Sequence, residues 1–123
     1  MLNILSVGIG GFLGTVLRYL IGLVPVSETL RFPIKTFIIN VVGCILIAII
    51  TVLVLKNSNM NPKIVLFIKT GLCGGFTTFS TFALESSDFI GSGHLGIALL
   101  YILLSVGVGI ATIFVVEYIN LKL

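Results

Sequence analysis

Charged residues are scarce in this sequence. Only 9% of its 123 residues are charged and 58% are hydrophobic, and its mean hydropathy is +1.29. Soluble domains carry roughly 25% charged residues, so a chain of this size has too few charges to cover a surface in water. The shortage excludes a soluble fold and predicts an integral membrane protein.

Residues that build disulfides, metal centres and nucleic-acid interfaces are also scarce. The two cysteines, Cys44 and Cys73, lie in apolar segments, so we expect small packed side chains and no disulfide. The single histidine, His94, has no surrounding pattern of metal ligands or nucleophiles, which argues against an enzyme. There is no run of basic residues and the net charge is only +3, so no nucleic-acid partner is expected.

Four stretches are long and apolar enough to cross a bilayer, because a spanning helix needs about 20 mostly apolar residues. We predict helices over residues 4–24, 37–55, 64–90 and 95–119, joined by short connections. The first has full spanning length and no basic leader, so we expect it to be a retained helix. The sequence therefore predicts a single all-α transmembrane domain over residues 1–123, with no soluble domain beside it.

Basic residues are divided almost evenly between the two ends of the predicted bundle. The end that holds both termini has Lys56, Lys63, Lys69 and Lys122, and the other end has Arg18, Arg31 and Lys35. Orientation in a membrane is set by a clear excess of Lys and Arg on one side, and there is none here. The near tie predicts insertion in both orientations and an antiparallel, dual-topology dimer.

The third predicted span is interrupted near its middle by small and polar residues. Its central run contains the glycines Gly71, Gly74 and Gly75 and the hydroxyl residues Thr77, Thr78, Ser80 and Thr81. In lipid every backbone polar group needs a partner within the protein. A break here, placed at residues 74–78, must therefore be buried or line a wet cavity, and we predict that it builds an ion site.

The glycine half of this run offers oxygen ligands to a cation. Where a helix stops, its last carbonyls lose their amide partners, and such carbonyls coordinate Na⁺ in transporters with broken helices. We expect the carbonyls of Gly74 and Thr77 to be the ligands. Two chains meeting at a twofold axis would supply four oxygens to one ion.

The phenylalanine half offers contacts to an anion. Phe79 and Phe82 lie three residues apart, and aromatic rings have a positive edge that attracts a small anion without carrying charge. Hydroxyls of Ser80 and Thr81, with the amide of Asn40, would replace lost hydration water. The alternative is that both phenylalanines only fill the core.

Polar residues also recur at helical spacing along the second and fourth predicted spans. The second span has Thr36, Asn40 and Gly43, and the fourth has Tyr101, Ser105, Gly109 and Thr112. Spacings of three and four place each set on one helix face. Each face is either a seam between helices or the wall of a pore, and Asn40 either bonds a neighbouring helix or donates to an anion.

Two charged residues lie within or close to the predicted spans. Arg18 follows the glycines of the first span and either snorkels to the interface or attracts anions at a pore mouth. Glu85 lies about two turns beyond Thr78, and intramembrane carboxylates are functional candidates by default. A proton-coupled exporter would need such a group.

Three motifs resemble those of the Fluc/CrcB family of fluoride channels, and together they cover most of the chain. The run Gly74-Gly75-Phe76-Thr77-Thr78-Phe79-Ser80-Thr81-Phe82 is similar to the family's third-helix signature. Gly10-Gly11-Phe12-Leu13-Gly14 with Arg18-Tyr19 resembles its first-helix motif, and Asn40-Val41-Val42-Gly43 resembles its second. The resemblance implies a dual-topology homodimer with two fluoride pores and a central structural Na⁺ on the carbonyls of Gly74 and Thr77.

The resemblance also implies which residues would form the pathway. The fluoride pathway would include Phe79, Phe82, Asn40, Ser80, Thr81, Tyr101 and Ser105, with Arg18 at the vestibule. Thr15 and Lys35 stand where the family is expected to carry smaller residues.

The function expected from the resemblance is passive, fluoride-selective efflux across the cell membrane, which protects the cell from fluoride toxicity. The main alternative is a small, dual-topology, proton-coupled exporter that uses Glu85. A second alternative is an assembly subunit that has no pore.

Overall fold

The computed structural model describes residues 1–27 and 31–122. The described elements are α1 (Leu2–Gly22), α2 (Ile34–Lys56), α3 (Pro62–Val65), η1 (Leu66–Leu72), α4 (Cys73–Phe76), α5 (Phe79–Gly91) and α6 (Leu95–Lys122). Four spans are long and apolar enough to cross a membrane, and the third of them is assembled from the elements α3 to α5. The predicted all-α membrane fold is confirmed.

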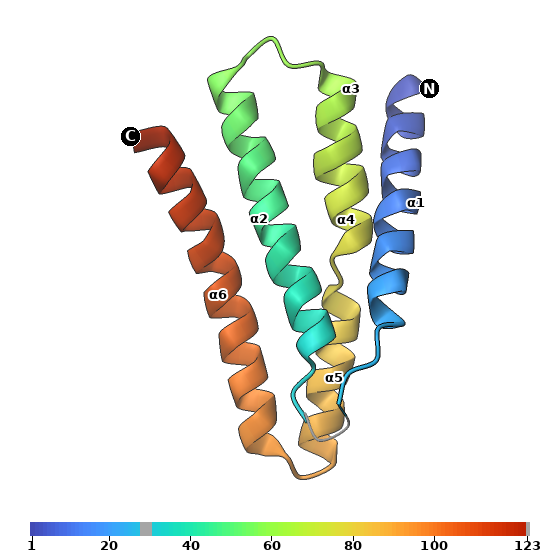
Figure 1. Ribbon diagram of the computed structural model, residues 1–123, viewed down its shortest axis with the longest axis vertical. Helices are drawn as coiled ribbons and strands as arrows, with labels where there is room; N and C mark the ends of the chain where they lie inside the picture. Colours follow the sequence, from blue (N-terminus) through green and yellow to red (C-terminus); the bar gives the residue numbers. More distant parts are fainter. Residues whose placement is uncertain (28–30, 123) are drawn as a thin grey trace.

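The four spans lie side by side, and both ends of the chain lie toward the same end of the bundle (Figure 1). The helix α2 packs against α6, while α1 packs against η1 and α4 of the third span. Most large apolar side chains are exposed on the single chain, and the small buried core includes Ile39, Ala48, Phe76, Ala98 and Tyr101. This distribution suits a protein whose outer surface faces lipid or a second chain.

The helix ends differ from the predicted ends by two or three residues at most positions. The first helix ends at Gly22, earlier than predicted, because Pro25 disfavours helical backbone in the residue before it. The helix α2 begins at Ile34, directly after Pro33, which suits a helix start because proline has no N–H to leave unpaired. Lys35 therefore belongs to the helix and not to the connection before it.

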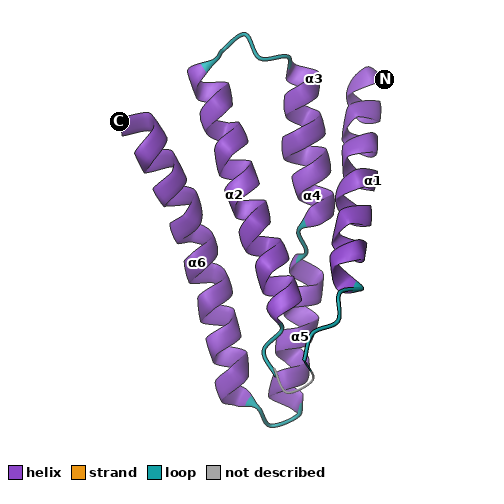
Figure 2. Ribbon diagram, viewed as in Figure 1, coloured by secondary structure: helices purple, strands orange, loops and turns teal. Residues whose placement is uncertain are grey.

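The third span contains two irregularities, of which only one was predicted. The π-helix η1 widens the chain over seven residues, a rare geometry that often marks functional sites. Thr77 and Thr78 are then extended, with ψ of 158° and 110°, and this short loop separates α4 from α5 (Figure 2). The predicted break is confirmed and is confined to these two residues, because Gly74 and Gly75 are still helical.

Glycines on α1 and the third span bring the two backbones into direct contact. We call the set Gly10, Gly14, Gly71 and Gly75 the glycine seam. A Cβ atom added to Gly14 would overlap a carbonyl of the third span, and one added to Gly75 would overlap the carbonyl of Gly11 on α1. Close approach of this kind is how helices associate in lipid, and it fixes η1 and α4 of the third span against α1.

Candidate functional site

Asn40 holds the break in the third span from the neighbouring helix α2. Its Oδ1 accepts a hydrogen bond from the backbone N–H of Thr78 at 2.8 Å, and its Nδ2 donates to the carbonyl of the same residue at 3.2 Å. One amide thus satisfies both backbone groups of Thr78, which would be costly to leave unpaired in lipid. Because the amide carries two N–H donors, Asn40 keeps one for another partner.

The same bonds release the two carbonyls that the sequence analysis picked out. In an unbroken helix, Thr78 N–H would bond Gly74 and Thr81 N–H would bond Thr77. Here Thr78 N–H donates to Asn40 at 2.8 Å, and Thr81 N–H donates to the Thr78 hydroxyl at 3.2 Å. The carbonyls of Gly74 and Thr77 have therefore lost their usual helical donors and offer oxygen to a hard cation.

The carbonyl oxygens at the break are ligands of the kind that suits a hard cation. No group of three or more His, Cys, Asp and Glu residues comes together in the described part of the chain. Gly74 is exposed, and a Cβ atom there would meet nothing within 4 Å. The break is therefore open to the surface of the single chain at Gly74.

Hydroxyl groups cluster at the start of α5. The Thr78 hydroxyl donates to the Thr81 hydroxyl at 2.9 Å and lies 3.4 Å from the Ser80 hydroxyl. By accepting from Thr81 N–H, it also caps the helix, as threonine does at a helix start. Ser80 is exposed and Thr81 is half-buried, so two hydroxyls remain accessible beside the break.

Glu85 joins three of the helices through its carboxylate. Thr36 of α2 donates to Oε1 at 2.8 Å, and Tyr101 of α6 donates to Oε2 at 2.8 Å. Tyr101 is completely buried, so its hydroxyl has a fixed position. The carboxylate is a bonded part of the site, and one residue from each of the polar faces predicted for the second and fourth spans donates to it.

The two phenylalanines after the break are neighbours but have different surroundings. Their ring centroids are 5.7 Å apart, and the inner ring, Phe82, meets Tyr101 edge-on at 5.1 Å. Phe79 is 79% exposed. Core filling therefore describes Phe82 in part, whereas Phe79 projects from the single chain with its ring free for another contact.

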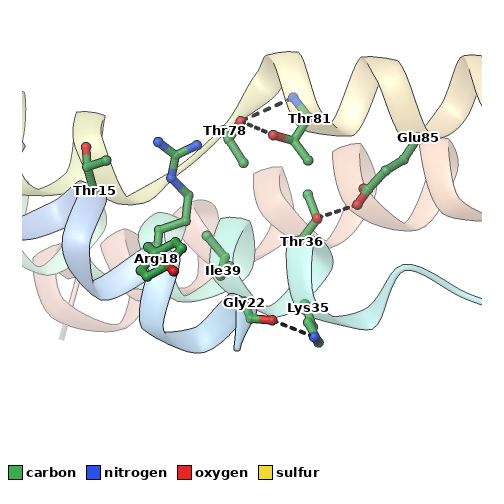
Figure 3. Close-up of a pocket in the computed structure, with 10 residues that line it drawn as sticks. Thr15, Arg18, Gly22, Lys35, Thr36, Ile39, Thr78, Thr81 and Glu85 are labelled. Atoms are coloured by element: carbon green, nitrogen blue, oxygen red, sulfur yellow. Dashed lines mark hydrogen bonds between the residues drawn. The ribbon is translucent and has the colours of Figure 1, made fainter. Parts of the chain in front are cut away.

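A cavity of about 430 Å³ opens beside these groups. Arg18 extends into it from α1 toward the break, while Thr36, Thr81 and Glu85 lie along its other walls (Figure 3). Arg18, which was predicted at a pore vestibule, thus lines a cavity beside the break. A positive guanidinium facing hydroxyl groups is an arrangement that draws anions inward.

A second cavity of about 330 Å³ is lined by residues of α2, η1, α4 and α6 and by Thr77 of the break. Asn40, Gly43, Gly74 and Thr77 belong to its walls, whereas Thr78 belongs to the first cavity. The hydrogen-bonded pair of Asn40 and Thr78 thus has one residue in the lining of each cavity.

Ser105 makes none of the hydrogen bonds described above. Its Oγ is buried and has no hydrogen-bond partner among the described residues. It follows Tyr101 by one turn on α6, and the next residue of the same face, Gly109, is also buried and approaches Cys44. A buried hydroxyl without a protein partner is available to water or to an ion.

Sequence reasoning did not select two residues that organise the site. Thr78 makes hydrogen bonds to Asn40, Ser80 and Thr81. The sequence pattern that could have indicated this role is a hydroxyl residue at the break, followed three residues later by a second hydroxyl residue, Thr81. Thr36 was placed on the polar face of α2 but was not assigned to the site. The prediction that Cys44 and Cys73 form no disulfide is confirmed, because both are free.

The family model described as "CrcB-like protein, Camphor Resistance (CrcB)" matches residues 5–116. This range contains the second and third spans, most of the first and fourth, and each residue of the site described above. The chain belongs to the CrcB family. It is a multi-pass membrane protein and not an enzyme, as the sequence predicted.

Relatives in the CrcB family extend over nearly the whole chain. A protein of Chlorobaculum tepidum named fluoride-specific ion channel FluC is 44% identical over 115 residues, which cover 93% of this chain and 90% of the relative. Proteins with the same name from Agrobacterium fabrum and Azobacteroides pseudotrichonymphae are 41% and 40% identical, covering 93% and 90% of this chain and 92% and 90% of their own lengths. No large insertion separates this chain from them.

Proposed function

We propose that this protein is a fluoride-selective channel that lets fluoride leave the cell passively across the cell membrane. The observation that carries the proposal is the break itself: a CrcB-family signature in which Asn40 holds the backbone of Thr78, and whose residues line two cavities. The relatives' name, fluoride-specific ion channel, identifies the ion. Fluoride enters acidic surroundings as neutral HF, ionises inside and is trapped, so a conducting anion pathway would relieve the cell.

The site residues supply what a small, strongly hydrated anion needs. Hydroxyls of Ser80 and Thr81, the spare N–H of Asn40 and the unpartnered hydroxyl of Ser105 would replace water as donors. The rings of Phe79 and Phe82 would contribute their positive edges. Arg18 would concentrate the anion in the first cavity, and buried Tyr101 would hold the inner ring and Glu85 in place.

The working unit that we propose is an antiparallel homodimer with a central structural Na⁺. The near tie of basic residues between the two ends supports dual topology. The carbonyls of Gly74 and Thr77, freed at an exposed break, would hold the ion together with those of a second copy. The ion would supply positive charge that balances carbonyl dipoles at the break, and exposed Phe79 would reach toward the partner.

The purified protein reconstituted in liposomes is expected to release fluoride rapidly when a K⁺ ionophore removes the opposing potential. Chloride release should be far slower, because a larger halide fits closely placed donors poorly. A fluoride electrode and a chloride electrode would measure the two rates in matched vesicles, with protein-free vesicles as the baseline. Equal rates for the two ions would exclude a fluoride-selective channel, and no release of either would favour a subunit without a pore.

Glu85→Gln is expected to leave fluoride release passive, which separates a channel from a proton-coupled exporter. Gln keeps one oxygen for Thr36 or Tyr101, whose hydroxyls each form a 2.8 Å bond to the carboxylate, so we expect a reduced but measurable rate. Release by the parent protein should not follow an imposed pH gradient. Complete loss of transport in Glu85→Gln together with proton-driven flux in the parent would instead identify an exporter.

A further inference from the structure

Lys35 belongs to the cavity that also contains Arg18, although it is carried by a different helix. It lies in the first turn of α2, and its ammonium donates to the carbonyl of Gly22 at 2.7 Å. Gly22 is the last residue of α1, which has no basic residue of its own in that turn. The carbonyl end of a helix attracts a cation, so α1 holds the Lys35 ammonium beside Gly22, which also lines the cavity (Figure 3).

The charges lining this cavity show what Lys35 contributes. Arg18, Lys35 and Glu85 are its charged residues. With Lys35 present, the two cations outweigh an ionised Glu85 by one charge, and without it the lining is neutral. Lys35 and Glu85 also lie together on a smaller neighbouring cavity of about 280 Å³. Lys35 therefore shares two cavities with Glu85, whose carboxylate would repel an anion, whereas Arg18 shares one.

We infer that Lys35 is a second anion-collecting residue of the vestibule, held in position by the end of α1. This role rests on the proposed function as an anion channel and adds a residue to it. Lys35 attracts the anion into the cavity by its charge and does not bind it at the break. One unit charge about 7 Å away in a water-like medium raises the local concentration of a monovalent anion roughly two- to threefold.

The test compares fluoride release by Lys35→Gln, Lys35→Arg and the parent protein in liposomes. At about 10 mM salt the screening length is about 30 Å, and at about 1 M it is about 3 Å, so a charge effect must disappear between the two. We expect Lys35→Gln to be roughly two- to threefold slower than the parent at low salt and equal to it at high salt. Lys35→Arg, which keeps the charge, should match the parent at both.

Lys56→Gln is the matched control, because Lys56 ends the same helix α2 at its opposite end and does not line this cavity. It should leave the rate unchanged at both salt concentrations. The inference is overturned if Lys35→Gln equals the parent at low salt, if its loss persists at high salt, or if Lys56→Gln loses as much. A parent protein that releases no fluoride would instead overturn the proposed function.

Discussion

Phe79→Ile is expected to reduce fluoride release to the level of protein-free vesicles while the protein stays folded. The side chain is 79% exposed in the single chain, so its removal opens no cavity in the core. Isoleucine keeps an apolar surface but has no ring and therefore no positive edge to offer an anion. The rate in liposomes and the elution volume in gel filtration would be measured on the same preparation.

Phe114→Ile provides the matched control for this variant. Phe114 is 66% exposed on α6, and it stacks on Tyr118, with ring centroids 6.0 Å apart, away from the break. The same loss of a ring at this position should leave the fluoride rate intact. Undiminished release by a well-folded Phe79→Ile would remove the ring-edge mechanism, and an altered elution volume would show that Phe79 serves assembly instead.

Gly14→Val is expected to prevent stable packing of α1 against the third span. Its Cβ would overlap the carbonyl of Leu72 and approach the amide of Phe76 at 2.8 Å. These neighbours are backbone atoms, so no change of rotamer relieves the clash. Overpacking costs roughly 3 kcal/mol at the upper end of its usual range, and here whole helices must separate. Loss of monodisperse protein in detergent, or a lower unfolding temperature, would report the effect.

Gly8→Val is the matched control for the glycine seam, because Gly8 lies on the same helix with nothing within 4 Å of its added Cβ. It should purify and unfold like the parent protein. If Gly14→Val behaved in the same way, the two helices would not be in contact through their backbones. If both variants failed, the cause would be valine in α1 in general and not the seam.

The lipid environment explains why so much of the fold could be predicted. Each span must satisfy its own backbone, so apolar length predicts the helices, and glycine and hydroxyl residues at membrane depth predict the break. The π-helix at Leu66–Leu72 was not predicted, although its sequence includes Lys69, Thr70 and Gly71. It packs against α1, and tertiary contacts of this kind are absent from a local pattern.

The candidate site was predictable as a set of residues but not as a set of bonds. Helical spacing placed Asn40 and Tyr101 on the polar faces of their spans, and both side chains hydrogen-bond to the third span. That Asn40 would bond both backbone groups of Thr78, and that Tyr101 would donate to Glu85, depends on how far the helices slide past one another. Sequence periodicity gives the direction of a side chain around its helix but not this axial offset.

The glycine seam also limits how this protein can vary. A clash between two side chains can be relieved by a smaller residue on either helix, so mutations in ordinary interfaces have suppressors across the contact. At Gly14 and Gly75 the opposing atoms are backbone atoms, and every residue has these atoms, so no substitution on the facing helix can make room. A defect in the seam can therefore be repaired only by reversion or by a shift of the whole helix, and a search for second-site suppressors should find none among the facing residues.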